Sequence, residues 1–265
     1  MLCTDIDGTL LNKDRNLSAL TISEMKRISD QIPIVLISSR MPKAMRHLQE
    51  SLGILDLPLI AYNGGLILDQ GRVLQTTEIP NVILKDTIEA CRHTNIHLSL
   101  YNNDDWFVPE MDYWAKREAH NTKVEPVVQT LDDTFRLWEE DHKGAHKIMA
   151  MGEETEIDGL FASLESDYRD QLHLYRSKPT YIEIAHRSIS KETAISVLLK
   201  ERYTDFEFGD IIAFGDNYND IEMLKAVGMG IAVANAKAEV LEIANDVSLS
   251  NVDDGVAVAI QKYFE

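Results

Sequence analysis

The sequence predicts an α/β protein whose parallel-sheet core is interrupted by a second, α+β domain. Over residues 1–76, and again from residue 191 onward, short apolar runs alternate with helical patterns, as in βαβ units. Between these regions the strand-like and helical segments lose that alternation. We therefore expect a Rossmann-like core from residues 1–78 plus 187–265, with an inserted α+β domain at residues 79–186.

The elements of the core follow from the spacing of its apolar residues. Short apolar runs predict strands, and apolar residues three or four apart predict helices. Asn63-Gly64 and Gln70-Gly71 favour tight turns into a hairpin. The expected strands are Met1–Asp5, Ile34–Ile37, Leu57–Ala61, Leu66–Leu68, Arg72–Gln75, Ile211–Phe214 and Gly230–Val233. The expected helices lie near residues 17–28, 44–52, 191–203, 220–226 and 255–264.

The inserted domain contains both the helical and the strand-like spacing of apolar residues, but its segments do not follow βαβ order. This favours an α+β fold. Its expected strands are His97–Tyr101, Trp106–Pro109, His146–Met151, Leu172–Ser177 and Tyr181–Ala185. Its expected helices are Val82–Thr94, Asp112–His120 and Glu154–Asp167.

The first strand ends in two carboxylates, Asp5 and Asp7, followed by Gly8 and Thr9. A strand end holds Asp5 rigidly, Gly8 permits a tight bend that exposes backbone N–H groups to an anion, and Thr9 adds a hydroxyl. A string of this kind arises by chance roughly once in 10⁵ positions. The alternative is an acidic surface turn, but the pattern favours phosphoryl-transfer chemistry.

A second acidic cluster, Gly215-Asp216-Asn217-Tyr218-Asn219-Asp220, follows the predicted strand Ile211–Phe214. Mg²⁺ prefers a few carboxylate oxygens and keeps several waters, so two acidic strand ends side by side would suit it. In isolation, Asn219 and Asp220 equally fit a helix cap. Together with the first cluster, they predict a metal site.

These segments resemble motifs one and four of the haloacid dehalogenase (HAD) superfamily of aspartyl-phosphate phosphatases. Ser38-Ser39-Arg40, after the strand Ile34–Ile37, resembles motif two, although Ser39 stands where the family more often has glycine. Lys191 occupies the place of the motif-three lysine, followed by Glu192 in place of glycine. The position and size of the inserted domain resemble the C2B cap of Cof-like, type IIB sugar-phosphate phosphatases, in which the cap sets substrate specificity.

The resemblance implies a Mg²⁺-dependent phosphomonoesterase that forms an aspartyl-phosphate intermediate. Asp5 is the implied nucleophile and Asp7 the implied acid and base. The implied metal ligands are Asp5, the backbone carbonyl of Asp7, Asp216 and Asp220, the last directly or through water. The implied phosphate- or substrate-binding residues are Ser38, Ser39, Arg40, Asn63, Lys191 and Asn219. Asn63 is equally well explained by the turn alone, and so is Asn235.

The composition of the chain excludes some classes of binding partner. The chain has 26 basic and 44 acidic residues, a net charge of −18, which argues against nucleic acid or an anionic membrane as the main partner. A small anionic phosphate ester would then be attracted locally, by the metal, Lys191 and Arg40. Two cysteines suggest no disulfide framework. With no apolar stretch near ~18 residues and no room for a signal peptide, we expect a cytoplasmic monomer or weak homo-oligomer.

Two other functions remain open at this stage. A phosphohexomutase would use the same aspartate pair, but its cap would need several basic residues to grip a distal phosphate, and Arg169–Lys178 offers three. A non-catalytic sugar-phosphate sensor would not need Asp7. The residues expected to choose the ester are His173, Arg176, Lys178, Glu183, Tyr101, Trp106 and Trp114.

Overall fold

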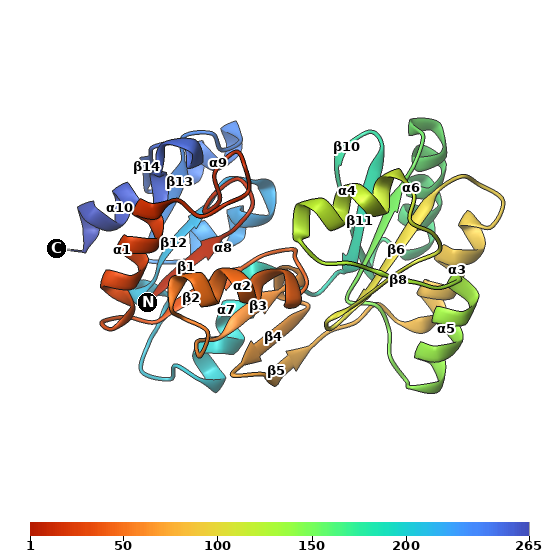
Figure 1. The fold of residues 1–265 in the computed structure, drawn as a ribbon, viewed down its shortest axis with the longest axis horizontal. Coiled ribbons are helices and arrows are strands. Elements are labelled where there is room, and N and C mark those ends of the chain that lie inside the picture. The colour runs from red at the N-terminus through yellow and green to blue at the C-terminus, as the bar shows by residue number, and fades with distance from the viewer. Residues whose placement is uncertain (265) are drawn as a thin grey trace. The chain divides into compact units, whose positions relative to one another are not determined.

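The structure, a computed structural model, describes residues 1–264, with Ser177 described by its backbone alone. It divides into two compact units, Met1–Gln75 together with the chain from Ser190 onward, and Thr76–Ile189 (Figure 1). The second unit thus begins at Thr76 rather than at residue 79, because residues 76–79 already form bonds with the rest of that unit. Thr76 Oγ1 lies 2.9 Å from His146 Nε2, and Ile79 forms an antiparallel bridge with Ala145.

The first unit is built on an eight-stranded sheet in the order β14-β13-β12-β1-β2-β3-β4-β5. Its strands are β1 (Leu2–Asp5), β2 (Ile34–Ile37), β3 (Leu59–Ala61), β4 (Leu66–Asp69), β5 (Arg72–Thr76), β12 (Ile212–Gly215), β13 (Met229–Val233) and β14 (Asp246–Ser248). Strands β14 to β3 pair in parallel, and β4 pairs antiparallel with β3. Leu2 lies opposite both Ile212 and Ile34, so β1 is central.

Helices cover both faces of this sheet (Figure 1), so its strand residues are buried on both sides. Cys3, Val35 and Ala213 share one apolar core with α7 and α8, while Leu2 and Phe214 on the opposite face are also fully buried. The helices are α1 (Ala19–Ser29), α2 (Lys43–Leu52), α7 (Lys191–Glu201), α8 (Ile221–Ala226), α9 (Ala238–Ile243) and α10 (Gly255–Tyr263). The predicted fold class is confirmed.

The second unit contains a six-stranded sheet in the order β10-β11-β9-β6-β7-β8, antiparallel except for the β7–β8 pair. Its strands are β6 (His97–Asn102), β7 (Asp105–Val108), β8 (Val127–Val128), β9 (Lys147–Met151), β10 (Leu172–Lys178) and β11 (Tyr181–His186). Its helices are α3 (Asn81–Cys91), α4 (Tyr113–Thr122), α5 (Leu131–Glu140) and α6 (Glu154–Tyr168). Alternate strand residues such as Leu98, Ile148 and Ile182 form one core with α3, α5 and α6.

Helix α5 was not among the expected elements, although the sequence carries signals for it. Thr130 is its N-cap, whose Oγ1 accepts the backbone N–H of Asp133 at 3.1 Å. Leu131, Phe135 and Trp138 follow at the spacing of one helix face and pack on the core of the second unit. The first unit likewise contains α9 and β14, which the periodicity did not indicate because both are short.

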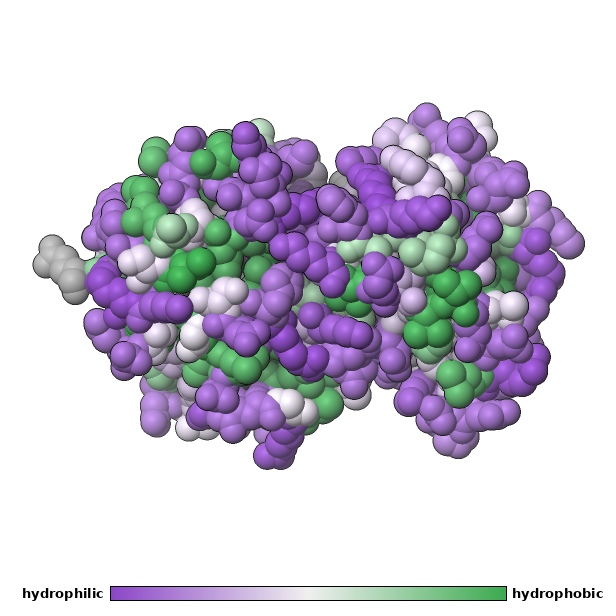
Figure 2. Space-filling model, in the orientation of Figure 1, coloured by the Kyte–Doolittle hydropathy of each residue, from purple (hydrophilic) through white to green (hydrophobic). Residues whose placement is uncertain are grey.

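Hydrophilic residues cover most of the visible face of each unit, and apolar residues appear there in small patches (Figure 2). Among residues 1–264, no helix has both the length and the apolar character that a membrane crossing requires.

Candidate active site

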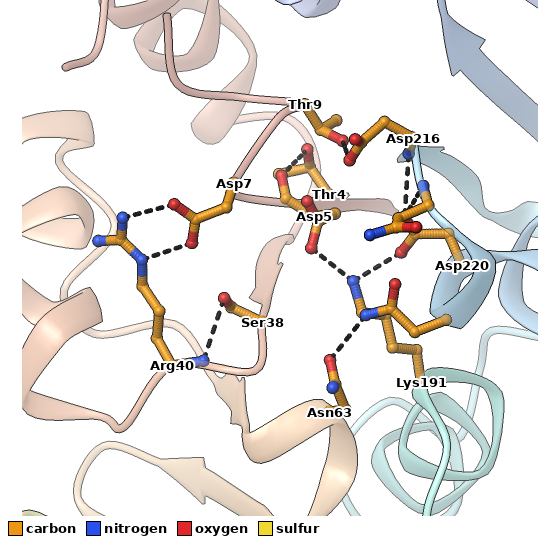
Figure 3. A network of polar contacts seen from close by, with 12 residues as sticks. Thr4, Asp5, Asp7, Thr9, Ser38, Arg40, Asn63, Lys191, Asp216 and Asp220 are labelled. Atoms are coloured by element: carbon orange, nitrogen blue, oxygen red, sulfur yellow. Dashed lines mark hydrogen bonds and ion pairs between the residues drawn. The ribbon is translucent and has the colours of Figure 1, made fainter. Parts of the chain in front are cut away.

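The two acidic clusters meet at the carboxyl edge of the first unit's sheet. Asp5 is the last residue of β1, and Asp216 directly follows β12. These strands are parallel neighbours, with Thr4 opposite Phe214, so both acidic ends lie side by side (Figure 3). This edge is where open α/β sheets bind ligands.

Lys191 joins the two clusters. Its Nζ donates to Asp5 Oδ1 at 2.5 Å and to Asp220 Oδ1 at 2.6 Å, and its side chain is fully buried (Figure 3). Lys191 is the first residue of α7, where Ser190 and Thr193 form a reciprocal capping box. The box fixes the start of the helix and so directs the lysine into the sheet edge.

Burial and charge act in opposite directions on this group of residues. Burial raises the pKa of Asp5 well above its ordinary value, and the nearby Lys191 ammonium only partly opposes that rise. Burial alone would lower the pKa of Lys191, but the charges of Asp220 and Asp5 outweigh it and raise the pKa. Lys191 is therefore a permanent cation.

Asp220 serves two purposes at once. Its Oδ2 accepts the backbone N–H groups of Asp216 and Asn217, at 2.9 and 3.0 Å, while its Oδ1 binds Lys191. The helix-cap interpretation is therefore compatible with a site carboxylate. Gly215 allows this close approach, since a Cβ there would lie 2.5 Å from the Cβ of Asp220.

The acidic cluster fits a hard divalent cation. Asp5, Asp216 and Asp220 each offer a carboxylate oxygen, and these oxygens lie within 4.8 Å of one another. Three carboxylates face one ammonium, so negative charge is in excess; burial and then the charge of Asp220 raise the pKa of Asp216 to about 6. An all-oxygen set with uncompensated charge suits Mg²⁺ or a similar ion.

Gly8 and Thr9 shape the same cluster from the loop after β1. Thr9 Oγ1 donates to Asp216 Oδ1 at 2.9 Å. Gly8 has φ +89°, and a Cβ there would lie 2.5 Å from Asp216 Oδ2. Glycine is therefore required at position 8 by both the backbone conformation and the space beside Asp216.

Asp7 points away from this cluster, toward two arginines. Arg40 donates Nε to Asp7 Oδ2 at 2.6 Å and Nη2 to Oδ1 at 2.7 Å (Figure 3). Arg15 adds a contact from Nη1 to Oδ1 at 3.1 Å. Arg40 was expected at the phosphate, whereas here its guanidinium is engaged by Asp7. Sequence reasoning did not select Arg15, because a single basic residue in a polar loop carries no signal.

The remaining expected residues lie close together on the β2 and β3 side. Ser38 is buried; its Oγ accepts the Arg40 N–H at 3.2 Å, and its carbonyl accepts the Asn63 N–H at 2.8 Å. Asn63 adopts the left-handed conformation (φ 54°), and its Oδ1 accepts Asn219 Nδ2 at 3.1 Å. Asn63 thus forms the turn and also joins motif four. Ser39 is half-buried.

Two asparagines from the C-terminal segment hold the loop after β1. Asn235 Nδ2 donates to the Gly8 carbonyl at 2.8 Å, and Asn251 Nδ2 donates to the Leu11 carbonyl at 2.7 Å. The Asn251 N–H in turn donates to Asn235 Oδ1 at 2.9 Å. Asn235 therefore has a structural bond to the site loop.

The candidate specificity residues lie in the second unit. Tyr101 and Trp106 are buried and stacked, with ring centroids 5.6 Å apart. Lys147 Nζ lies 4.6 Å from the centre of the Tyr101 ring. Arg176 Nη1 lies 2.5 Å from Asp158 Oδ1, in a partly exposed ion pair on the same unit.

Comparison with known proteins gives one consistent family. The model of the haloacid dehalogenase-like hydrolases matches residues 2–260. A Haemophilus influenzae protein named "Putative phosphatase" is 31% identical, over 98% of this chain and 97% of its own. A Bacillus subtilis 5-amino-6-(5-phospho-D-ribitylamino)uracil phosphatase is 27% identical, over 99% and 95%. The structure of a haloacid dehalogenase-like hydrolase from Bacteroides thetaiotaomicron superposes with a TM-score of 0.91 at 26% identity, covering 99% of this chain and 98% of that one.

Proposed function

The chain belongs to the haloacid dehalogenase-like hydrolase family, and from this premise we propose that it is a Mg²⁺-dependent phosphomonoesterase of sugar phosphates and related small esters. That the protein is a phosphatase follows from the family and its relatives. The metal, the sugar-phosphate class and the intermediate are our proposal. One observation carries it: a buried Asp5–Lys191–Asp220 ion-pair group with Asp216 beside it at the sheet edge.

In the proposed reaction, an oxygen of the Asp5 carboxylate attacks phosphorus. A bond forms between Asp5 and phosphorus while the bond from phosphorus to the ester oxygen breaks. Asp7 gives its proton to the departing oxygen. Water then attacks the aspartyl-phosphate, Asp7 takes the proton of that water, and free phosphate leaves with Asp5 regenerated.

The surrounding residues would hold the phosphoryl oxygens. Lys191 supplies a fixed positive charge, and Ser38 and Asn219 supply donors from the other side of the site. Asp5, Asp216, Asp220 and the backbone carbonyl of Asp7 would hold Mg²⁺, which when bound neutralises phosphoryl charge. Because Lys191 is already held by Asp5 and Asp220, and Asn219 by Asn63, little reorganisation is needed when substrate binds.

The second unit, Thr76–Ile189, is proposed as the domain that selects the substrate. The name of the Bacillus subtilis relative supports small sugar-derived phosphate esters, since that protein acts on a phosphorylated ribityl compound. In this proposal the stacked aromatic pair Tyr101–Trp106 and the adjacent Lys147 are among the residues that select the substrate.

The test is phosphate release from a panel of sugar phosphates, nucleotides, pyridoxal phosphate and flavin mononucleotide, with Mg²⁺ and with chelator. The same panel is given to Asp5→Asn and, as control, to Asp56→Asn, which changes an exposed aspartate. We expect metal-dependent release that Asp5→Asn abolishes and Asp56→Asn retains. Near wild-type release by folded Asp5→Asn would refute the nucleophile, and an isomerised sugar phosphate without free phosphate would indicate a mutase.

A further inference from the structure

The loop after β1 presents an arginine whose guanidinium is only partly used. Arg15 makes one contact to Asp7, from Nη1 to Oδ1 at 3.1 Å, and its side chain is 46% exposed. Among the described residues, no protein acceptor binds its other N–H groups. A single exposed contact of this kind is weak, so it can be exchanged for another anion at little cost.

Asp7 does not depend on Arg15 for its charge partner. Both of its carboxylate oxygens are already bonded by Arg40, whose guanidinium is 6% exposed. Lys191 is likewise engaged by Asp5 and Asp220. Arg15 therefore differs from these two cations, because it contacts Asp7 and also has solvent-exposed donors that bind no protein acceptor among the described residues.

The backbone holds Arg15 in this place. Asn12 Oδ1 accepts the N–H groups of Asp14 and Asn16, at 3.0 and 3.1 Å, and the Asn12 carbonyl accepts the Arg15 N–H at 2.9 Å. Arg15 itself has φ 57°, a left-handed conformation that is unfavourable for arginine. A closed loop that keeps a non-glycine residue in this conformation is typical of functional positions.

The position of Arg15 decides which part of a substrate it can reach. The inference rests on the proposed function, in which Asp7 protonates the oxygen that leaves phosphorus. Because Arg15 contacts the same Asp7 oxygen that Arg40 Nη2 contacts, its free donors lie beside the leaving group rather than beside the phosphoryl group. A guanidinium with free donors binds carboxylate or phosphate best, through paired hydrogen bonds.

We propose that Arg15 is a specificity-determining residue that binds a second anionic group on the leaving-group side of the ester. The favoured substrates are then phosphorylated sugar acids and bisphosphates, with a carboxylate or second phosphate within a few bonds of the scissile oxygen. A local cation of this kind is needed because the whole chain, at −18, repels such compounds.

The test compares two esters that differ only at one carbon: 2-phosphoglycerate, which carries a carboxylate, and glycerol 2-phosphate, which carries a hydroxymethyl group there. Steady-state kinetics are measured for wild type, Arg15→Ala, Arg15→Lys and the control Lys13→Ala. Lys13 is an exposed cation of the same loop, so its removal changes the net charge equally. Calorimetric binding of both compounds to Asp5→Asn, with and without Arg15→Ala, provides a second reading that does not require turnover.

We expect wild type to prefer 2-phosphoglycerate, and Arg15→Ala to lower that preference at least tenfold, mainly through KM. Arg15→Lys should retain part of it, and Lys13→Ala all of it. Equal losses for both esters, or equal or absent binding of both compounds by Asp5→Asn, would overturn the inference. If no ester is hydrolysed but Arg15→Ala still removes selective binding, the proposed function fails and the anion site stands.

Discussion

Arg40 holds Asp7 by a two-point fork, with Nε on Oδ2 at 2.6 Å and Nη2 on Oδ1 at 2.7 Å. The guanidinium is buried, and its Nη1 also donates to the Ala44 carbonyl at 3.3 Å. A planar fork fixes the plane of the carboxylate as well as its distance. The candidate acid and base therefore has a set orientation before any substrate arrives.

Replacing this fork should weaken acid catalysis selectively. Arg40→Lys keeps a positive charge but has no planar pair of donors, so the Asp7 carboxylate can rotate. We expect kcat for alkyl phosphates to fall by roughly 10- to 100-fold. The fall should be smaller for p-nitrophenyl phosphate, whose leaving group needs no proton. The exposed Arg92→Lys serves as control, and an equal fall for both ester types would argue against this role.

Removing the buried cation should destabilise the protein. In Lys191→Met, Asp5 and Asp220 lose their shared partner while remaining buried, which costs about 3–5 kcal/mol in comparable cases. Urea unfolding in chelator measures the loss, and added Mg²⁺ should restore part of it. Lys200→Met, exposed near the end of the same helix, should change stability little. Unchanged stability of Lys191→Met would contradict the ion-pair arrangement.

A methyl group at Gly8 should displace Asp216. Gly8→Ala combines backbone strain at φ +89° with a Cβ 2.5 Å from Asp216 Oδ2. Gly71→Ala is a matched control, since Gly71 has φ +80° and nothing within 4 Å of its Cβ position. Both should lose about 1–3 kcal/mol of stability from strain. Only Gly8→Ala should lose Mg²⁺ affinity, roughly tenfold or more. Similar Mg²⁺ affinities of the two variants would show that the space between Gly8 and Asp216 does not matter for metal binding.

The raised pKa of Asp216 sets a pH dependence. Its folded-state pKa of about 6 exceeds the ordinary value of about 3.9, so the folded protein binds this proton more tightly than the unfolded chain. The metal-free protein should therefore lose stability as pH rises from about 4 to about 6, with Asp5 acting in the same direction. Thermal melts in chelator measure this, and Asp216→Asn should reduce the slope.

Mg²⁺ should compete with the same proton. Because carboxylate ligands must be ionised, Mg²⁺ affinity should fall as pH drops below about 6, and binding there should release protons. Calorimetric titrations with Mg²⁺ at pH 5.5 and pH 8, in buffers of different ionisation enthalpy, separate proton release from binding. Equal Mg²⁺ affinity at both pH values would mean that Asp216 is not a metal ligand.

The parallel core and its acidic edge could be predicted because each rests on local patterns. Apolar runs such as Ile34–Ile37 ended where β2 ends, and Asp5 and Asp216 follow strands whose carboxyl ends must share one edge. The pairing of β12 with β1, by contrast, could not be predicted, since pairing across some two hundred residues leaves no periodic signal.

The partners of the arginines could not be predicted. Arg40 directly follows the two serines of motif two, which suggests phosphate contact, yet its side chain reaches Asp7 on a different strand end. Arg15 depends on the left-handed backbone of a loop closed by Asn12, and sequence spacing does not reveal such a conformation. Helix α5 could have been predicted from Thr130 and its apolar spacing.

The central position of β1 has a consequence for synthesis on the ribosome. On one side Leu2 pairs with Ile34 of β2, but on the other it pairs with Ile212 of β12. At about 5–20 residues per second, β12 is made roughly 10 to 40 s after β1. Every strand pair of β6 to β11 closes within Thr76–Ile189, so that segment can fold during the wait. A nascent chain stalled before Lys191 should then resist protease in the inserted segment alone, and β1 would gain its second neighbour, β12, only after that segment has folded.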